Sequence, residues 1–178
     1  MSVAIDSNGT LVSASGSHAP PNAVTGTALL EHALAQEVKE FHFHVYFFQS
    51  NPEITERAHR LRSQILDLVS QGYFRVQATK TRTGHEVNTV PRGPHTMGSF
   101  EVWCAMEDFA RAFQWFALNH GEFSVLIHPL SKEEIKDHTT RATWLGQPVP
   151  LDFTILQEYL QVVPVQYPEL GLGYSSKK

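Results

Sequence analysis

The stretch Phe-His-Phe-His-Val-Tyr-Phe-Phe, residues 41–48, is the run of this sequence most typical of a β-strand, because aromatic residues and valine fill it. Side chains alternate between the two faces of a strand, so His42, His44 and Tyr46 share one face. The other face is wholly apolar and suits a protein core. Two neighbouring imidazoles on such a strand have two explanations: hydrogen-bonded core histidines, or a metal site.

The composition indicates one globular domain without a nucleic-acid or membrane partner. The chain has 178 residues and a formal net charge of -4, with no cluster of lysine and arginine that could bind nucleic acid. No apolar run approaches the roughly 20 residues that a membrane-spanning helix needs, and the N-terminus lacks a signal-peptide pattern. The single cysteine, Cys104, excludes an internal disulfide framework and favours a reducing compartment, so we expect a cytoplasmic protein.

The chain is expected to divide into an arm and a domain. Residues 1–26 are rich in Ser, Gly, Asn, Ala and Pro without apolar periodicity, which predicts a flexible N-terminal arm. Residues 27–178 are expected to form a single domain with a C-terminal extension from about residue 129. Outside the central part of this domain, helical segments are predicted at 27–40, 132–137 and 152–162.

The central part predicts four strands and two helices. Asn51 as N-cap and Pro52 at the first helical position begin a helix that runs to Val69, with apolar residues at steps of three and four. After the strand at 41–48 and this helix, strands are expected at 73–79, 99–104 and 123–128, and a helix at 106–119. The order β-α-β-β-α-β is the split βαβ or ferredoxin-like pattern, an α+β fold in which two helices cover one face of an antiparallel sheet and the first strand is central.

The strand faces bring four candidate ligands to one side of this sheet. The apolar side of the first strand must meet the helices, which sends His42 and His44 to the open face. The third and fourth strands send Glu101 and His128 to the same side, because their apolar residues must also meet the helices. We interpret this convergence as a metal or catalytic centre on the open sheet face.

Several segments together resemble one family, the DOPA 4,5-dioxygenases of fungi and their bacterial relatives. The matching pieces are residues 41–47, 93–102 and 125–130, with 137–139 and 144–147 behind them. They follow one another in the right order between about residues 40 and 155. The resemblance implies a small non-haem iron enzyme that opens the ring of a catechol, DOPA or a similar compound, with O₂.

Extradiol cleavage needs Fe(II), or another divalent metal, with few protein ligands, so that positions remain for both catechol oxygens and O₂. Neutral imidazoles and a carboxylate suit that metal. We expect His42, His44 and His128 to be the ligands. An alternative set of two histidines and one carboxylate replaces one of these residues by Glu101.

Two further histidines are candidates for acid/base catalysis. His95 lies in a polar loop at 80–97 that can close over the open sheet face, and it is the first candidate to take a catechol proton. His138 is the second candidate, or a group that supports a ligand. The alternatives are that His95 only caps a turn and that His138 only ends a helix.

Four other residues are candidates for binding the substrate. Arg92 or Arg141 can hold a substrate carboxylate in a bidentate pair, although arginines are more often solvated surface. Tyr46 and Trp103 can pack against the catechol ring. They can instead belong to a homodimer interface, because open faces of ferredoxin-like sheets commonly pair.

Two rival functions share this fold and these residues. One is a cofactor-independent, dimeric ferredoxin-like oxygenase in which the histidines act as bases without a metal. The other is a non-catalytic module that stores a metal or a ligand on the open face. Metal content and O₂ consumption separate the three.

Overall fold

The computed structural model describes residues 3–5, 7, 11–13, 26–79 and 84–177, and the chain separates into two units, Met1–Glu37 and Val38–Lys178. The first unit contains an antiparallel pair of strands and a helix, which are β1 (Val3–Ile5), β2 (Leu11–Ser13) and α1 (Gly26–Ala35). The predicted helical segment at 27–40 corresponds to α1 but ends earlier. The flexible arm predicted for 1–26 falls mostly outside the described residues and stays a prediction.

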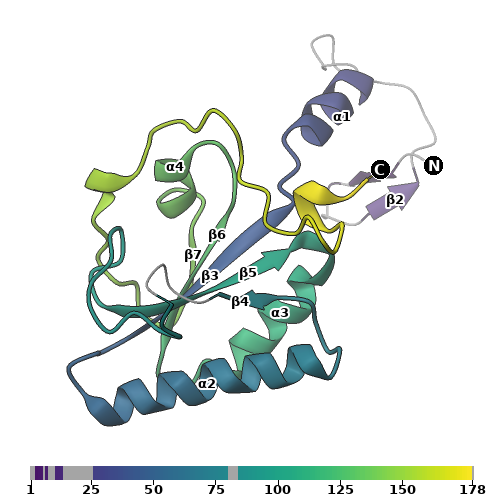
Figure 1. The fold of residues 1–178 in the computed structure, drawn as a ribbon. Helices are drawn as coiled ribbons and strands as arrows, with labels where there is room; N and C mark the ends of the chain where they lie inside the picture. The colour runs from purple at the N-terminus through teal and green to yellow at the C-terminus, as the bar shows by residue number, and fades with distance from the viewer. Residues whose placement is uncertain (1–2, 6, 8–10, 14–25, 80–83, 178) are drawn as a thin grey trace. The chain divides into compact units, whose positions relative to one another are not determined.

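The second unit is built on a five-stranded antiparallel sheet with two helices against one face (Figure 1). Its strands are β3 (Glu40–Phe47), β4 (Gln77–Ala78), β5 (Gly98–Ala105), β6 (Ser124–Pro129) and β7 (Thr143–Leu145), in the spatial order β4-β5-β3-β6-β7. The helices against it are α2 (Pro52–Ser70) and α3 (Met106–Asn119). The order β3-α2-β4-β5-α3-β6, with β3 in the centre, confirms the predicted ferredoxin-like fold.

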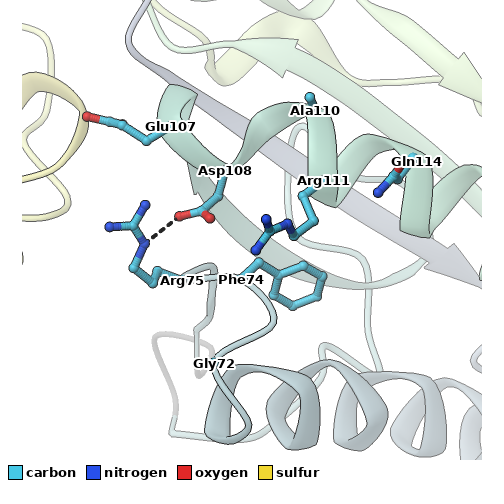
Figure 2. A pocket seen from close by; sticks show the side chains of 8 residues that line it. All are labelled: Gly72, Phe74, Arg75, Glu107, Asp108, Ala110, Arg111 and Gln114. Carbon is cyan, nitrogen blue, oxygen red and sulfur yellow. Dashed lines mark hydrogen bonds and ion pairs between the residues drawn. The ribbon is translucent and has the colours of Figure 1, made fainter.

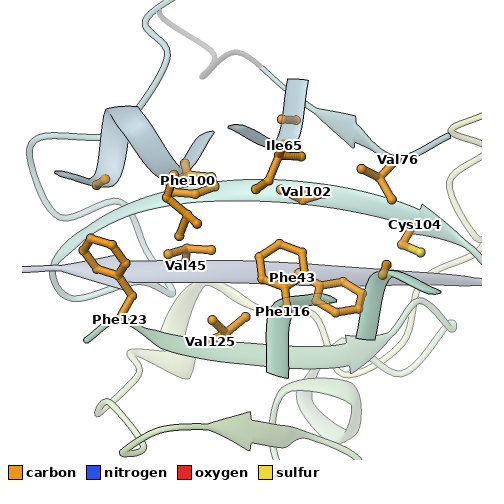
Figure 3. Packing of buried hydrophobic residues seen from close by; sticks show 14 of the residues in the cluster. Phe43, Val45, Ile65, Val76, Phe100, Val102, Cys104, Phe116, Phe123 and Val125 are labelled. Carbon is orange, nitrogen blue, oxygen red and sulfur yellow. The ribbon is translucent and has the colours of Figure 1, made fainter. Parts of the chain in front are cut away.

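The apolar face of β3 packs against both helices (Figure 3). Phe43 and Val45 are fully buried, and Phe43 stacks on Phe116 of α3 with 4.9 Å between the ring centroids. Ile65 of α2 is also fully buried in this cluster. Each such side chain contributes about 1.5–3 kcal/mol through burial. Because alternate residues of a strand point to opposite sides, the histidines of β3 must face away from this core.

Helix α2 begins as the sequence predicts. The side-chain oxygen of Asn51 accepts hydrogen bonds from the backbone N–H groups of Glu53 and Ile54 at 3.0 and 3.3 Å, and Pro52 is the first helical residue. After the helix ends, Gly72 has a φ of 74°, a left-handed conformation that glycine adopts without strain. Helix α3 has the bounds that the sequence predicts.

The strand predicted at 73–79 is mostly wrong, because only Gln77–Ala78 pairs in the sheet. The backbone N–H of Tyr73 bonds back to the carbonyl of Leu68 at the end of α2, and the Tyr73 carbonyl accepts from Arg111 of α3. These groups are therefore not available to a sheet. The next charged residue, Arg75, bonds to Asp108 of α3 at 2.8 Å, in a pocket of about 600 Å³ (Figure 2).

The C-terminal extension is less helical than predicted. The helix expected at 152–162 is only a 3₁₀ turn, Phe153–Ile155, because later backbone N–H groups bond elsewhere: Gln157 to the Glu134 side chain, and Leu160 to the Lys132 carbonyl. The extension also supplies a short helix, α4 (Glu134–His138), a last 3₁₀ turn (Gly173–Ser175) and the unpredicted strand β7. None of the helices in the described part of the chain is long and apolar enough to cross a bilayer.

Candidate metal centre

Three histidines converge on the sheet face opposite the helices. His42 and His44 come from β3, and His128 comes from β6, where the strand register places it beside His42. Each offers one ring nitrogen, and these atoms all lie within 4.8 Å of one another. The Nε2 atoms of His44 and His128 are 3.1 Å apart, in rings only 6° from parallel. The structure thus brings together the three residues that the sequence predicts as ligands.

The centre is buried, although the sequence predicts an open sheet face. His44 and His128 expose only 4% and 2% of their surface. Burial, and after it the neighbouring histidines, hold the pKa of both imidazoles well below the ordinary value of 6.5. Both rings are therefore neutral at physiological pH, which is the form that binds a metal ion.

A backbone carbonyl sets the tautomer of His128. Its Nδ1 lies 2.8 Å from the carbonyl oxygen of Pro129, so Nδ1–H donates and the lone pair is on Nε2, toward His44. His138 of α4 is held in the same way, with Nδ1 2.9 Å from the carbonyl oxygen of Glu134. Metal-binding histidines almost always donate their second ring N–H to such an acceptor. His128 is therefore held as a ligand requires.

Glu101 supplies a carboxylate at the edge of the cluster. It lies opposite His44 in the β3–β5 register, and its Oε1 is 2.8 Å from Nδ1 of His42 and 3.8 Å from Nε2 of His44. Burial raises the pKa of the Glu101 carboxyl, but the hydrogen bond and charge of His42 outweigh it, and the net shift is downward. Glu101 is therefore ionised. A ligand set of two histidines and the Glu101 carboxylate thus stays an alternative to the three histidines.

The two acid/base candidates both contact this cluster. The ring centroid of His95 is 4.3 Å from that of His44, and the centroid of His138 is 3.9 Å from that of His128. Burial lowers the pKa of His95 to about 4, and it also lowers the pKa of His138. Both imidazoles are therefore neutral near pH 7 and able to accept a proton.

Tyr46 connects His95 to a neighbouring pocket. Its hydroxyl lies 2.7 Å from Nδ1 of His95. Burial, followed by the charge of Glu101, raises the pKa of Tyr46, so the hydroxyl keeps its proton. Tyr46 also lines a pocket of about 590 Å³, together with Phe48 and Met97 among others. Ligand sites for small molecules commonly have about 300–1,000 Å³, so this volume suits an aromatic compound.

Both ring nitrogens of His42 have partners. Nδ1 bonds to Glu101, as described, and Nε2 lies 2.6 Å from the side-chain nitrogen of Gln166. The indole ring of Trp103 stacks on the imidazole at 17°, with 6.1 Å between the centroids. Gln166 is a site residue that the sequence does not reveal, because one glutamine in a proline-rich C-terminal segment carries no spacing signal.

The two candidate arginines differ in their hydrogen-bond partners. Arg141 bonds to Glu133, to Oδ1 of Asp137 at 2.9 Å and to Oγ of Ser131 at 3.0 Å, which ties it to α4. Arg92 is exposed, and its backbone N–H and carbonyl pair with those of His95 at 2.9 and 2.8 Å. Arg92 therefore closes the turn that carries His95, whereas the charge of Arg141 is already matched by carboxylates.

Most residues of this site lie within the range that a protein-family model matches. The model of the Dopa 4,5-dioxygenase family matches residues 41–155. The chain belongs to this family. The match confirms the resemblance seen in the sequence, and its range includes the three histidines, Glu101, His95 and His138. Gln166 lies beyond it.

Individual relatives agree with this assignment. DOPA 4,5-dioxygenase from Amanita muscaria is 42% identical over 147 residues, which cover 83% of this chain and 62% of the relative. An uncharacterized 21.2 kDa protein from Botryotinia fuckeliana is 31% identical over 129 residues, 68% of this chain and 65% of the relative. The chain thus spans less than two thirds of either relative.

A solved structure agrees in fold as well. The crystal structure of a candidate dioxygenase from Nostoc punctiforme matches with a TM-score of 0.54 and 27% identity. The match covers 65% of this chain and 88% of that one.

Proposed function

We propose that this chain is a dioxygenase that opens the ring of a catechol, DOPA or a close analogue, by extradiol cleavage with O₂ at a non-haem Fe(II). The observation that carries this proposal is the buried convergence of His42, His44 and His128 in a chain of the Dopa 4,5-dioxygenase family. The Amanita muscaria relative has the corresponding name, but the chain covers only 62% of it, so the activity is proposed for this chain.

The donor set fits a divalent iron ion. Neutral imidazole nitrogens are ligands that such a metal accepts, and those of the three histidines, which could hold it, lie within 4.8 Å of one another, with Nε2 of His44 3.1 Å from Nε2 of His128. His42 completes the set of nitrogens, and Glu101 is the carboxylate that could replace one of them. When bound, Fe(II) supplies one place where the catechol oxygens and O₂ meet and electrons pass from the ring to O₂.

His95 and Tyr46 form the proposed pair for proton transfer. When Nδ1–H of His95 donates to the Tyr46 oxygen, Nε2 carries a lone pair and can accept a proton from the catechol. The imidazolium formed in this way can return that proton from Nε2 to the opening ring, and His95 is then neutral again with Nδ1–H bonded to the Tyr46 oxygen. Since both groups are neutral at physiological pH, the pair can serve in both directions. His138 is the second candidate for this role.

The substrate is proposed to enter from the pocket beside Tyr46, with that ring and Trp103 as apolar contacts for the catechol. Arg92 is the preferred partner for a substrate carboxylate, because Arg141 already bonds to Asp137 and Glu133. A homodimer and a cytoplasmic location stay predictions from the sequence.

The decisive experiment measures metal content and O₂ consumption together. Protein purified without chelators should contain near-stoichiometric iron and consume O₂ with a catechol from a panel that includes DOPA. His44→Ala should lose both, whereas His59→Ala, a surface histidine of α2 beside Glu86, should keep both. Full activity after exhaustive chelation would contradict the proposal and favour the metal-free oxygenase. Bound iron without O₂ consumption across the panel would favour a binding module.

A further inference from the structure

The C-terminal segment around Gln166 is anchored against the strands that carry the metal centre. The carbonyl of Gln166 accepts from the Gln77 side chain of β4 at 3.4 Å. The next residue, Tyr167, is fully buried, and its hydroxyl donates to the carbonyl of Trp103 on β5 at 2.6 Å. Gln166 itself is 9% exposed. Its amide is therefore held against His42 by its own segment.

Only one of the two polar atoms of the Gln166 side-chain amide has a hydrogen-bond partner among the described residues. Its nitrogen lies 2.6 Å from Nε2 of His42, while its oxygen is buried and has no hydrogen-bond partner among the described residues. In this orientation the amide N–H donates to Nε2 of His42, and Nδ1–H of His42 donates to Glu101. Both ring nitrogens are then occupied, and His42 has no lone pair to offer a metal.

A half-turn of the amide reverses this pattern, because the oxygen and nitrogen of a glutamine side chain have nearly the same outline. The oxygen of Gln166 then accepts from Nε2–H of His42, and Nδ1 carries the lone pair. That lone pair faces the Glu101 carboxylate oxygen at 2.8 Å, an arrangement that is repulsive until a cation is present. The same glutamine thus matches both tautomers of His42.

We propose that Gln166 is a positioning residue that sets the tautomer of His42 when a divalent metal binds. In the tautomer with the ring proton on Nδ1, its N–H donates to Nε2. On metal binding its oxygen accepts from Nε2–H, the ring proton moves from Nδ1 to Nε2 with no net change, and Nδ1 becomes the ligand atom. The inference rests on the part of the proposed function that has His42 as a metal ligand.

Three variants separate this role from packing alone. Gln166→Leu removes both donor and acceptor, whereas Gln166→Glu keeps an acceptor in a side chain of the same size. Gln161→Leu, an exposed position of the same segment, is the matched control. The Zn²⁺ dissociation constant is measured by competition with a chromophoric chelator. Removing the partner of a metal-binding histidine typically weakens metal affinity 10–100-fold, so we expect about that loss for Gln166→Leu and less than about threefold for the other two variants.

The tautomer itself can be read in the wild-type chain. Long-range ¹H–¹⁵N correlation spectra should show the His42 proton on Nδ1 without metal and on Nε2 with Zn²⁺. A proton that stays on Nδ1 in the zinc form overturns the proposal, as does unchanged affinity in a folded Gln166→Leu. A chain that binds zinc as expected but, when loaded with iron, consumes no O₂ with any catechol of the panel overturns the proposed function alone. Normal dioxygenase activity with unchanged affinity in Gln166→Leu overturns this inference alone. A wild-type chain that binds no metal overturns both.

Discussion

The two faces of β3 are both buried, but by different partners. Phe43 and Val45 contact α2 and α3, the helices that belong to the ferredoxin-like pattern itself. His44, on the other face, is covered by groups from outside that pattern, with the rings of His95 and His138 near it. The two helices of the ferredoxin-like fold cover one face, and loops and the C-terminal extension cover the other.

The interactions that stabilise the fold therefore lie on one face of β3, and the residues of the proposed function lie on the other. Burial of apolar side chains stabilises the core face. On the histidine face, burial removes water from imidazoles and lowers their pKa, which stabilises the fold little but keeps ring lone pairs available. Substitutions on the two faces should therefore affect different measurements.

The largest effect on stability is expected on the core face. Phe43→Ala leaves a cavity against Phe116, and such substitutions cost about 3–5 kcal/mol of a total stability of about 5–15 kcal/mol. Urea denaturation followed by circular dichroism measures the loss. A loss below about 1 kcal/mol would contradict the assignment of this face as the core.

The next effect concerns stabilisation by metal. A metal that binds only the folded chain, at 100 times its dissociation constant, adds about 2.7 kcal/mol. Thermal unfolding of the wild type should therefore shift upward when Zn²⁺ is added. His44→Ala, compared with its own unfolding temperature without metal, should show no such shift, and a full shift in this variant would exclude His44 as a ligand.

The contrast between the faces also explains what could be predicted from the sequence. The alternation along β3 is local, so His42, His44 and the apolar residues between them reveal both faces without any knowledge of the rest. The covering of the histidine face depends on contacts between distant residues, such as Gln166 with His42. Local pattern carries no such information, which is why the sequence indicates a loop that can close over this face but reveals neither Gln166 nor β7. The shortness of β4 also depends on contacts that a local pattern does not show, since Tyr73 bonds to the helices and not to the sheet.

A smaller effect is expected from Tyr46, where the histidine face meets the pocket. Tyr46→Phe removes the hydroxyl that bonds to Nδ1 of His95, so the His95 tautomer is no longer set. One hydrogen bond contributes about 0.5–1.5 kcal/mol, and about 1.4 kcal/mol is tenfold in rate, so kcat should fall up to about tenfold. Zn²⁺ affinity should not change. Tyr159→Phe, at an exposed tyrosine, is the control, and a kcat equal to wild type in Tyr46→Phe would remove the pair from proton transfer.

The smallest effect is expected from Glu40, which begins β3 and lies on the same face as His42. Its side chain is fully buried, with Oε1 accepting from the backbone N–H of Tyr174 at 3.0 Å and Oε2 without a partner among the described residues. Burial raises the pKa of this carboxyl above its ordinary value of 4.5. A raised pKa in the folded chain means that Glu40 favours folding most below about pH 4.5 and that this contribution is lost as the pH rises through the folded pKa.

Glu40→Gln tests this directly, because the amide keeps an acceptor for Tyr174 and cannot ionise. The variant should unfold at a higher temperature than the wild type at pH 7. The difference should shrink as the pH falls through the raised pKa of folded Glu40 and should be absent below about pH 4.5. Glu158→Gln, at an exposed position of the extension, is the matched control and should follow the wild type at both pH values. If Glu40→Gln unfolds at a lower temperature than the wild type at pH 7, the charge of Glu40 stabilises the fold. Burial on this face would then favour a paired carboxylate as well as neutral imidazoles.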